Sequence, residues 1–239
     1  MCFVKSIPAV LVVLSFSLFS AAVEGQSTLF NIPSTDVVAK KRVYLEFDFI
    51  SHFESHSDGG FQGYIPRTVV GVGKRTEVGL NVAFTDAFLP DQPIEIQPNA
   101  KYQLYRNEGK GVTVAAGGIL YAPIAHRQGT DTFGMLYTVV SKQVKGAYGP
   151  RVTGGAYGLV GRANGTGTEA GGIVGYEQPL ITGRVSFVAD WFSGRNRFGY
   201  ATPGFAITVS KTSLLYAGYS IGNQGRKNNA LFVYYGITF

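Results

Sequence analysis

The chain has 239 residues, enough for one domain or at most two, and a formal net charge of +6. Its only cysteine, Cys2, precedes an N-terminal apolar run, so the rest of the chain excludes a disulfide framework, a cysteine nucleophile and a zinc–thiolate site. After that run, no apolar stretch approaches the roughly 20 residues that a membrane-spanning helix needs.

Residues 1–25 have the layout of a secretory signal peptide. Lys5 gives a positive start, residues 7–19 form the apolar run, and small residues follow it. The run is too short to span a membrane as a helix. We therefore predict that the chain is exported and that cleavage follows either Ala22 or Gly25.

Twelve segments with period-two alternation follow, and we predict that each is a β-strand. In the first, residues 42–50, apolar side chains alternate with Tyr44, Glu46 and Asp48. Two segments, 100–105 and 205–210, are the most weakly patterned, so ten strands is the alternative count. The remaining segments are 67–73, 77–84, 111–122, 132–140, 151–161, 169–178, 183–192, 213–221 and 230–239.

The connections between these segments alternate in length. Those at 51–60 and 85–93 are long, whereas those around Lys74 and at 107–110 are short. The middling connection at 145–150 is the exception. Short turns on one side and long loops on the other are typical of transmembrane β-barrels. The sequence thus favours an all-β, up-and-down antiparallel barrel over a soluble sandwich.

The last ten residues, ALFVYYGITF, place only apolar side chains on one face. In lipid every backbone polar group must be paired within the protein, so a spanning sheet has to close on itself. We therefore predict that the last strand pairs with the first and turns this face toward hydrocarbon. The face consists of Leu231, Val233, Tyr235, Ile237 and Phe239.

The ending x-Y-x-I-x-F, with Phe239 last, resembles the C-terminal signature of bacterial outer-membrane β-barrels. The resemblance implies the outer membrane of a Gram-negative-type bacterium, with its lipids and its barrel-assembly machinery as partners. In that class the terminal strand helps the machinery to recognise the chain. The segment Pro66 to Phe84, PRTVVGVGKRTEVGLNVAF, is similar to hairpins in uncharacterised barrels of the transporter or phenol-degradation-pathway type.

Residues 42–239 are thus expected to form the barrel, and residues 26–41, which lack alternation, precede it. Two interpretations of this N-terminal segment remain open. It lies in the periplasm, or it folds into the lumen as a small plug. If it is a plug, deleting residues 26–38 should raise the conductance of the barrel.

Charged residues at inward positions are the candidate functional site, because lipid constrains the outward positions. Neighbouring strands lie roughly 4.8 Å apart, which allows cross-strand pairing of these charges. They form either a constriction that selects polar solutes or a paired network that stiffens a filled lumen. A first group comprises Glu46, Asp48, Arg67, Glu77 and Lys101, and a second comprises Arg151, Glu177 and Arg184.

The first long connection contains SHFESHSD, and alternation would place His52, Glu54, His56 and Asp58 on one side if the strand continued. Imidazole and carboxylate groups together can hold a divalent transition metal. The favoured alternative is a solvated loop tip, so no metal or cofactor is expected. A second loop carries an aromatic cluster, interpreted as an interfacial belt, at Trp191, Phe192, Phe198 and Tyr200.

A channel or transporter for small molecules is the function that the barrel favours. The alternative is a structural or adhesive barrel whose outer loops bind ligands. A third possibility is a lipid hydrolase, which needs a Ser–His pair held by a third polar group. The only histidines, His52, His56 and His126, fall in or beside predicted loops, so we expect no enzyme. No motif indicates nucleic-acid binding.

Overall fold

The computed structural model describes residues 28–86, 92–127, 130–161, 167–225 and 228–239. The predicted signal peptide, residues 1–25, lies outside the described residues. Within the described part, no helix is long and apolar enough to cross a membrane.

Twelve β-strands make up the fold, and one short 3-10 turn, η1 (His56–Asp58), follows the first of them. The predicted count of twelve is therefore confirmed, and the alternative of ten is wrong. The strands are β1 (Val43–His52), β2 (Phe61–Gly71), β3 (Thr76–Thr85), β4 (Ile94–Asn107), β5 (Val112–Ala125), β6 (Phe133–Gln143), β7 (Arg151–Val160), β8 (Ala170–Ile181), β9 (Val185–Phe192), β10 (Tyr200–Thr208), β11 (Ser213–Gly222) and β12 (Ala230–Thr238).

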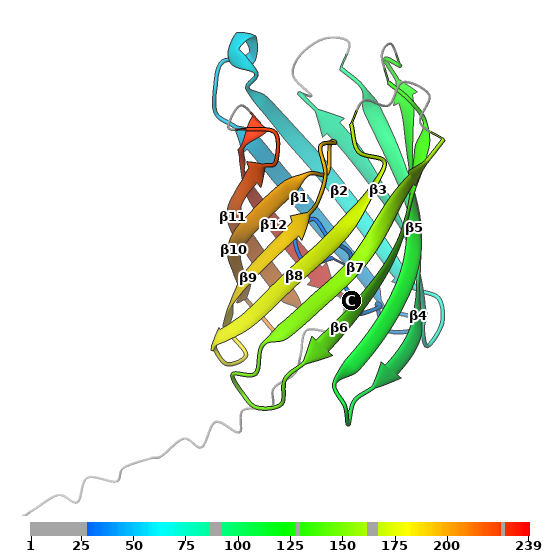
Figure 1. The fold of residues 1–239 in the computed structure, drawn as a ribbon, viewed down its shortest axis with the longest axis vertical. Helices are drawn as coiled ribbons and strands as arrows, with labels where there is room; N and C mark the ends of the chain where they lie inside the picture. Colours follow the sequence, from blue (N-terminus) through cyan, green and yellow to red (C-terminus); the bar gives the residue numbers. More distant parts are fainter. Residues whose placement is uncertain (1–27, 87–91, 128–129, 162–166, 226–227) are drawn as a thin grey trace, which may run out of the picture.

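Each strand pairs antiparallel with its neighbours in sequence, and β12 closes the sheet onto β1 (Figure 1). The closing register sets Leu45 opposite Ile237 and Phe49 opposite Val233. This confirms the predicted all-β, up-and-down antiparallel barrel and the pairing of its last strand with its first. Closure leaves no strand edge in the barrel wall unpaired.

Two strands begin six residues before their predicted starts at 67 and 100, and each runs through a proline. β2 runs through Pro66, and β4 runs through Pro98. Around each proline, pairing is interrupted on one side only: the β2–β3 ladder passes from Tyr64 to Arg67, and the β4–β5 ladder from Ile96 to Asn99. Proline supplies no N–H to a ladder, so the strand continues where that donor is not needed.

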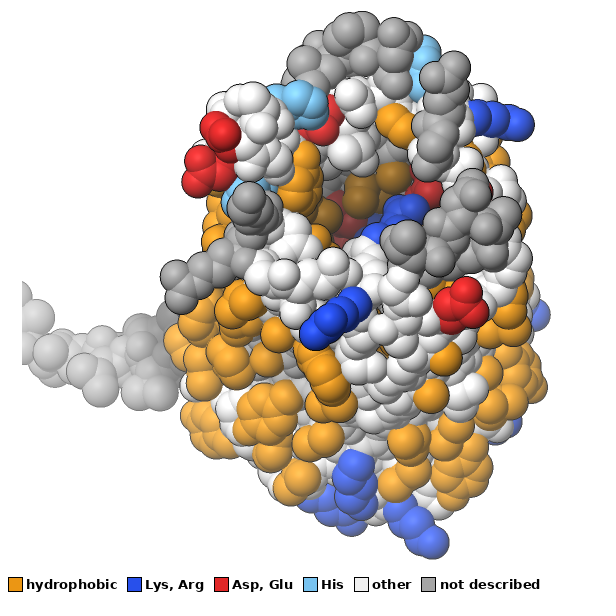
Figure 2. Space-filling view, turned by 45° about the horizontal axis from the view of Figure 1, so that its top comes forward, with side chains coloured by type: hydrophobic (Ala, Val, Ile, Leu, Met, Phe, Trp, Pro, Cys, Tyr) orange, Lys and Arg blue, Asp and Glu red, His pale blue; other side chains and the backbone are white. Residues whose placement is uncertain are grey.

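The outward positions of the strands form an exposed apolar surface, as the alternation predicted. On β12, Tyr235 is 44% exposed, whereas its inward neighbours Phe232 and Tyr234 are buried. Figure 2 shows the corresponding hydrophobic side chains covering the barrel wall. Other members of this surface are Leu45, Phe47, Val78, Leu80, Leu104, Leu136, Val152, Val174 and Phe205.

The two ends of the barrel differ in their connections. The end that we call the loop end carries connections 53–60, 86–93, 126–132, 161–169, 193–199 and 223–229. The other, the turn end, carries the shorter connections 72–75, 108–111, 182–184 and 209–212, together with the longer 144–150. The predicted alternation of long and short connections is present, with the expected exception.

Residues 28–39, here called the inner segment, lie inside the barrel (Figure 1, dark blue). The side chains of Leu29, Phe30 and Ile32 are essentially inaccessible and belong to the same apolar cluster as inward residues of the strands. The chain then reaches the turn end, where Lys40 bridges to Gly71 before β1 begins. Much of the barrel interior is thus filled by the chain's own N-terminal part.

Candidate functional site in the barrel lumen

The tip of the inner segment is a tight turn held by one carboxylate. The Leu29 N–H donates to the Ile32 carbonyl at 2.9 Å. The N–H groups of Phe30, Asn31 and Ile32 all donate to Oδ2 of Asp190, at 2.9, 2.6 and 3.1 Å. Charged acceptors strengthen such bonds, and Asp190 on β9 is almost fully buried. Asp190 was missed by our sequence analysis, because nothing local indicates that a distant turn supplies its donors.

Apolar contacts fix the same turn against the wall. The Phe30 ring packs edge-on to Tyr216, with centroids 5.9 Å apart, and lies 4.7 Å from the Phe232 ring. Gly175 on β8 provides the space for its neighbours. A Cβ atom at this position would lie 2.7 Å from terminal carbons of both Leu29 and Ile32. The absence of a side chain here therefore allows the segment to approach the sheet closely.

Farther along, the inner segment makes polar contacts with four strands. The Thr35 hydroxyl lies 2.6 Å from that of Ser141 on β6, and the Thr35 carbonyl accepts a bond from Gln103 on β4. The Val38 N–H donates to Glu77 on β3 at 2.6 Å. Arg151 on β7 donates to the Thr35 hydroxyl at 2.7 Å. These bonds tie the segment to one side of the wall, between β3 and β7.

Asp36 completes these contacts through an ion pair, with its Oδ2 2.5 Å from Nη1 of Arg151. Burial opposes ionisation of this carboxyl. The Arg151 guanidinium, assisted by the more distant Lys101 and Arg106, outweighs burial and holds the pKa of Asp36 below its ordinary value of 3.8. Asp36 is therefore ionised at neutral pH.

The first predicted group of inward charges forms two ion-paired clusters. Arg67 on β2 lies 2.7 Å from Asp48 and 3.5 Å from Glu46 on β1. Lys101 on β4 lies 3.0 Å from Glu77 on β3, and both side chains are 1% exposed. The register places Glu46 opposite Arg67 and Glu77 opposite Lys101, so each cluster is a direct cross-strand neighbour pair.

The second predicted group is only partly assembled. Arg151 and Glu177 are opposite each other on β7 and β8, with Nε and Oε2 3.5 Å apart. Arg184, in contrast, is exposed in the β8–β9 turn, because β9 begins only at Val185. The expectation that Arg184 joins the inward charges is therefore wrong, because the predicted strand 183–192 begins two residues before β9 does.

Above the inner segment, toward the loop end, the lumen contains a cavity of about 600 Å³, which we call the vestibule. Figure 2 shows the hollow from the loop end, with hydrophobic, basic and acidic side chains inside it. Thr28, Asn31 and Pro33 are among its lining residues, so the tip of the inner segment forms part of its wall. The vestibule is thus bounded by the barrel and by the inner segment together.

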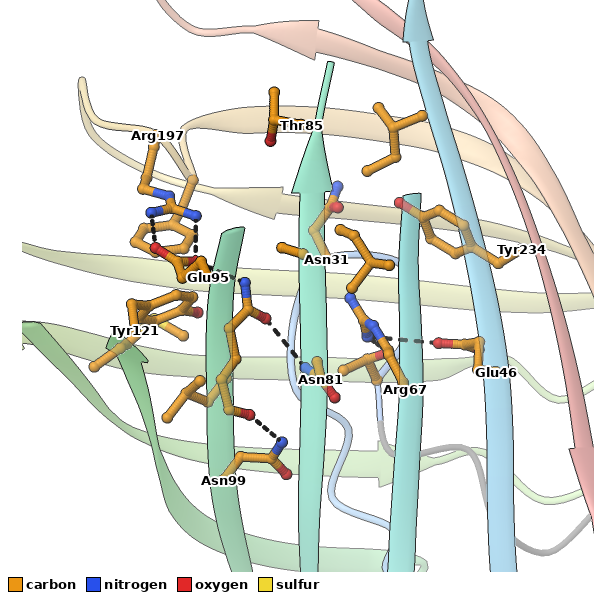
Figure 3. A pocket seen from close by; sticks show the side chains of 18 of the residues that line it. Asn31, Glu46, Arg67, Asn81, Thr85, Glu95, Asn99, Tyr121, Arg197 and Tyr234 are labelled. Atoms are coloured by element: carbon orange, nitrogen blue, oxygen red, sulfur yellow. Dashed lines mark hydrogen bonds and ion pairs between the residues drawn. The ribbon is translucent and has the colours of Figure 1, made fainter. Parts of the chain in front are cut away.

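A hydrogen-bonded row of polar side chains crosses one wall of the vestibule (Figure 3). Arg197, from the β9–β10 connection, donates two 2.9 Å bonds to the two oxygens of Glu95 on β4. Gln97 also donates to Glu95, at 2.8 Å, and Asn81 donates to Gln97 at 3.2 Å. Asn81 stands opposite Arg67 in the β2–β3 register, so the row leads to the Arg67 cluster.

Aromatic rings line the part of the vestibule around Arg197. Its guanidinium carbon lies 5.0 Å from the Tyr121 ring centroid, 5.6 Å from that of Phe133 and 5.5 Å from that of Phe198. Phe192, Phe198 and Tyr200 line the vestibule, whereas Trp191 is exposed. The interpretation of all four as an outer belt is therefore wrong for three of them, because Phe192 and Tyr200 occupy inward positions of β9 and β10 and the β9–β10 connection turns Phe198 inward.

The four loop residues considered for a metal do not share one side of a strand. β1 ends at His52, whose Nδ1 bonds to the Asn229 carbonyl, and η1 takes over at His56–Asp58. Glu54 is exposed, and Asp58 accepts a bond from the Ser55 hydroxyl. Among the described residues, no group of three or more His, Cys, Asp or Glu side chains is arranged to hold a metal ion.

No protein-family model matches the chain, and no curated protein sequence matches it. Several solved structures, however, are similar to it in fold. The KdgM porin in complex with disordered oligogalacturonate has a TM-score of 0.51 at 9% identity, covering 83% of this chain and 98% of that one. Outer membrane phospholipase A from Escherichia coli has a TM-score of 0.49 at 13% identity, covering 89% and 97%. At 9% identity the likeness to the porin concerns the fold alone: with its closed sheet of twelve antiparallel strands, the chain has the architecture of an outer-membrane β-barrel.

Proposed function

We propose that this protein is an outer-membrane β-barrel through which small molecules pass, with the vestibule as the entry site and the inner segment as a plug. The membrane placement is supported by the closed sheet, which pairs the backbone of the wall, and by the exposed apolar surface around it. In this proposal the loop end faces outside and the turn end faces the periplasm. Outer-membrane lipids surround the barrel, and the assembly machinery reads the strand ending at Phe239.

One observation carries the proposal: the tip of the inner segment forms part of the vestibule wall. Residues Thr28, Asn31 and Pro33 face the cavity, while residues 35–38 bond to the lower wall. Movement of this one segment would therefore extend the vestibule toward the turn end without disturbing any strand pair. A cavity of this volume lies within the range of small-molecule sites.

The lumen as a whole favours small neutral or cationic solutes, while the charges that line the vestibule itself are balanced, with Glu46 and Glu95 against Arg67 and Arg197. Rings and aliphatic side chains provide apolar surface, and Asn81, Gln97 and Asn99 provide amide groups. Among the described residues, acidic side chains inside the lumen outnumber basic ones, which favours cations over anions. The acids are Glu46, Asp48, Glu77, Glu95, Glu177, Asp190 and Asp36 of the inner segment, and the bases are Arg67, Lys101, Arg151 and Arg197.

The charged residues divide into two roles under this proposal. Glu46 and Arg67 line the vestibule and are placed to contact solutes. Glu77 and Lys101 are shielded from solvent, so their pairing stiffens the lower wall. The sequence left two roles open for these charges, selecting solutes and stiffening the barrel wall. In this proposal each role belongs to a different pair of residues.

The test is solute entry into liposomes and ion current in planar bilayers. We expect swelling with small neutral solutes, together with a current whose reversal potential indicates cation preference. Arg67→Ala removes a positive charge from the vestibule wall, so it should increase that preference. An absence of swelling and current, both in the full chain and in Arg67→Ala, would overturn the channel proposal.

The filled lower lumen favours a second function, a non-transporting barrel whose loops bind external partners. This alternative predicts no swelling, even after the inner segment is removed. No observation favours a lipid hydrolase: His52 and His56 have hydrogen bonds to the Asn229 and Gly60 carbonyls. If the protein released fatty acid from lipids and His52→Ala lost this activity, the hydrolase would become the favoured function.

A further inference from the structure

Exposed basic side chains are concentrated at the turn end of the barrel. Residues 40–42, which precede β1, are two lysines and an arginine, and all three are exposed. The β2–β3 connection adds Lys74 and Arg75, and the β4–β5 hairpin adds Arg106 and Lys110. Three further sites complete the set, which we call the basic rim: Lys142 and Lys145 near the β6–β7 connection, Arg184 between β8 and β9, and Lys211 between β10 and β11.

The basic rim is almost uncompensated within the described part of the chain. Two accessible acidic side chains are described near this end: Glu108, which pairs with Arg106 at 3.1 Å, and the partly exposed Asp36, which pairs with Arg151. The described part of the loop end is mixed instead, since exposed Glu54, Asp58 and Glu169 lie there together with exposed Arg127, Arg195 and Arg197. Neutralisation of the rim therefore requires anions from outside the chain.

The rim lies directly beyond the exposed apolar surface. Val144 precedes Lys145, and Tyr105 precedes Arg106, and both of these apolar residues are more than 40% exposed. Tyr148 and Tyr176 are also exposed near this end. Tyrosine is enriched where hydrocarbon meets water. Figure 2 shows basic side chains along the lower edge of the molecule, next to the hydrophobic surface.

The distribution of the rim identifies its partner. Every connection at the turn end contributes at least one cation, as does the residue run before β1. A compact protein or nucleic acid would contact one sector, whereas lipid headgroups surround the whole circumference. Positive charge next to a membrane attracts anionic lipids and acts within about 10 Å at ordinary ionic strength.

We propose that the basic rim binds anionic phospholipid headgroups of the periplasmic leaflet, and so gathers these lipids around the turn end. The proposal rests on the membrane orientation proposed above, but not on passage of solutes. It goes beyond that function because it assigns a lipid class to one end of the barrel.

The test uses the full barrel reconstituted in mixed phosphatidylcholine and phosphatidylglycerol vesicles and extracted in mild detergent. The ratio of the two lipids retained on the protein is then measured. We expect phosphatidylglycerol to be enriched several-fold over the vesicle, and high salt in the extraction to reduce that enrichment. A retained ratio equal to that of the vesicle would overturn the proposal.

Two sets of variants test whether the anionic lipids bind at the turn end. Lys145→Gln with Lys211→Gln should lower the enrichment, and adding Lys74→Gln, Arg75→Gln, Lys110→Gln and Lys142→Gln should lower it much further, since only five of the eleven rim cations then remain. Arg127→Gln with Arg195→Gln, which alters exposed bases at the loop end, should leave the enrichment unchanged. Equal loss in both pairs, or full enrichment in the six-fold variant, would contradict the proposal. Liposome swelling measured on the same samples reports separately on solute passage.

Discussion

The two halves of the lumen are built from the same strands but differ in what occupies them. Toward the turn end, the inner segment fills the space, and the Glu77–Lys101 and Arg151–Glu177 pairs lie around it. Toward the loop end, the vestibule remains open, with a row of amides and charges on one wall and aromatic rings near Arg197. The inward faces of a barrel therefore do not determine by themselves whether its lumen is open. A short segment before the first strand determines it here.

The largest expected effect is loss of the lower wall's buried ion pair. Lys101→Met removes the buried cation that pairs with Glu77 at 3.0 Å, so we expect the free energy of unfolding to fall by about 3–5 kcal/mol. Adding Glu77→Gln should recover most of this, because a neutral amide still accepts from Val38. Thermal or urea unfolding in detergent measures both, and an equally unstable double variant would contradict this account.

The next effect concerns the anchor of the inner segment. Asp190→Ala removes the acceptor of three N–H groups, and we expect docking of the segment to weaken by about 3 kcal/mol. Hydrogen exchange at residues 30–32 should accelerate, and ion current should rise. Asp58→Ala, at an exposed loop position, is the control and should change neither. Unaltered exchange in Asp190→Ala would argue that other contacts hold the turn.

A smaller effect is expected at the glycine that faces the turn. Gly175→Val would place its side chain against Leu29 and Ile32, so docking should weaken by about 1–3 kcal/mol. Gly154→Val on the neighbouring strand is the matched control, because a Cβ atom there meets nothing within 4 Å. Ion current should rise in the first variant and remain unchanged in the second. The same current in both would show that contact at Gly175 is unimportant.

The smallest effect is a pH dependence of docking through Asp36. Since its pKa is lower in the folded protein, its stabilising contribution is complete above the ordinary value of 3.8. The contribution is lost as the pH falls through the lowered value. Hydrogen exchange of the inner segment should therefore accelerate under strongly acidic conditions, and Asp36→Asn should remove this part of the pH response. A response that is identical in Asp36→Asn would assign it to other carboxyls.

Much of the wall could be predicted from the sequence, because strand alternation is local. It indicated the twelve strands, the closure of β12 on β1 and the inward positions of Glu46, Arg67, Glu77 and Lys101. The ends of elements were less predictable. Arg184 lies one residue before β9 begins, and β2 begins at Phe61, six residues before its predicted start.

The vestibule could largely not be predicted from the sequence, because its contacts join residues far apart in the chain. Glu95 and Arg197 meet across the lumen only because the β9–β10 connection folds inward. Asp190 acquires its role only from a turn formed by residues 29–32. The sequence signal that was available, a run without alternation before β1, left open whether that run lies outside the barrel or within it.

The central claim, that the inner segment closes the lumen of a channel, is tested most directly by single-channel conductance in planar bilayers. The full chain is compared with a chain that lacks residues 26–38, both verified as folded barrels. We predict small or rare openings in the full chain and a clearly larger, steady conductance in the shortened one. Equal conductance in the two proteins, or no conductance in either, would contradict the account.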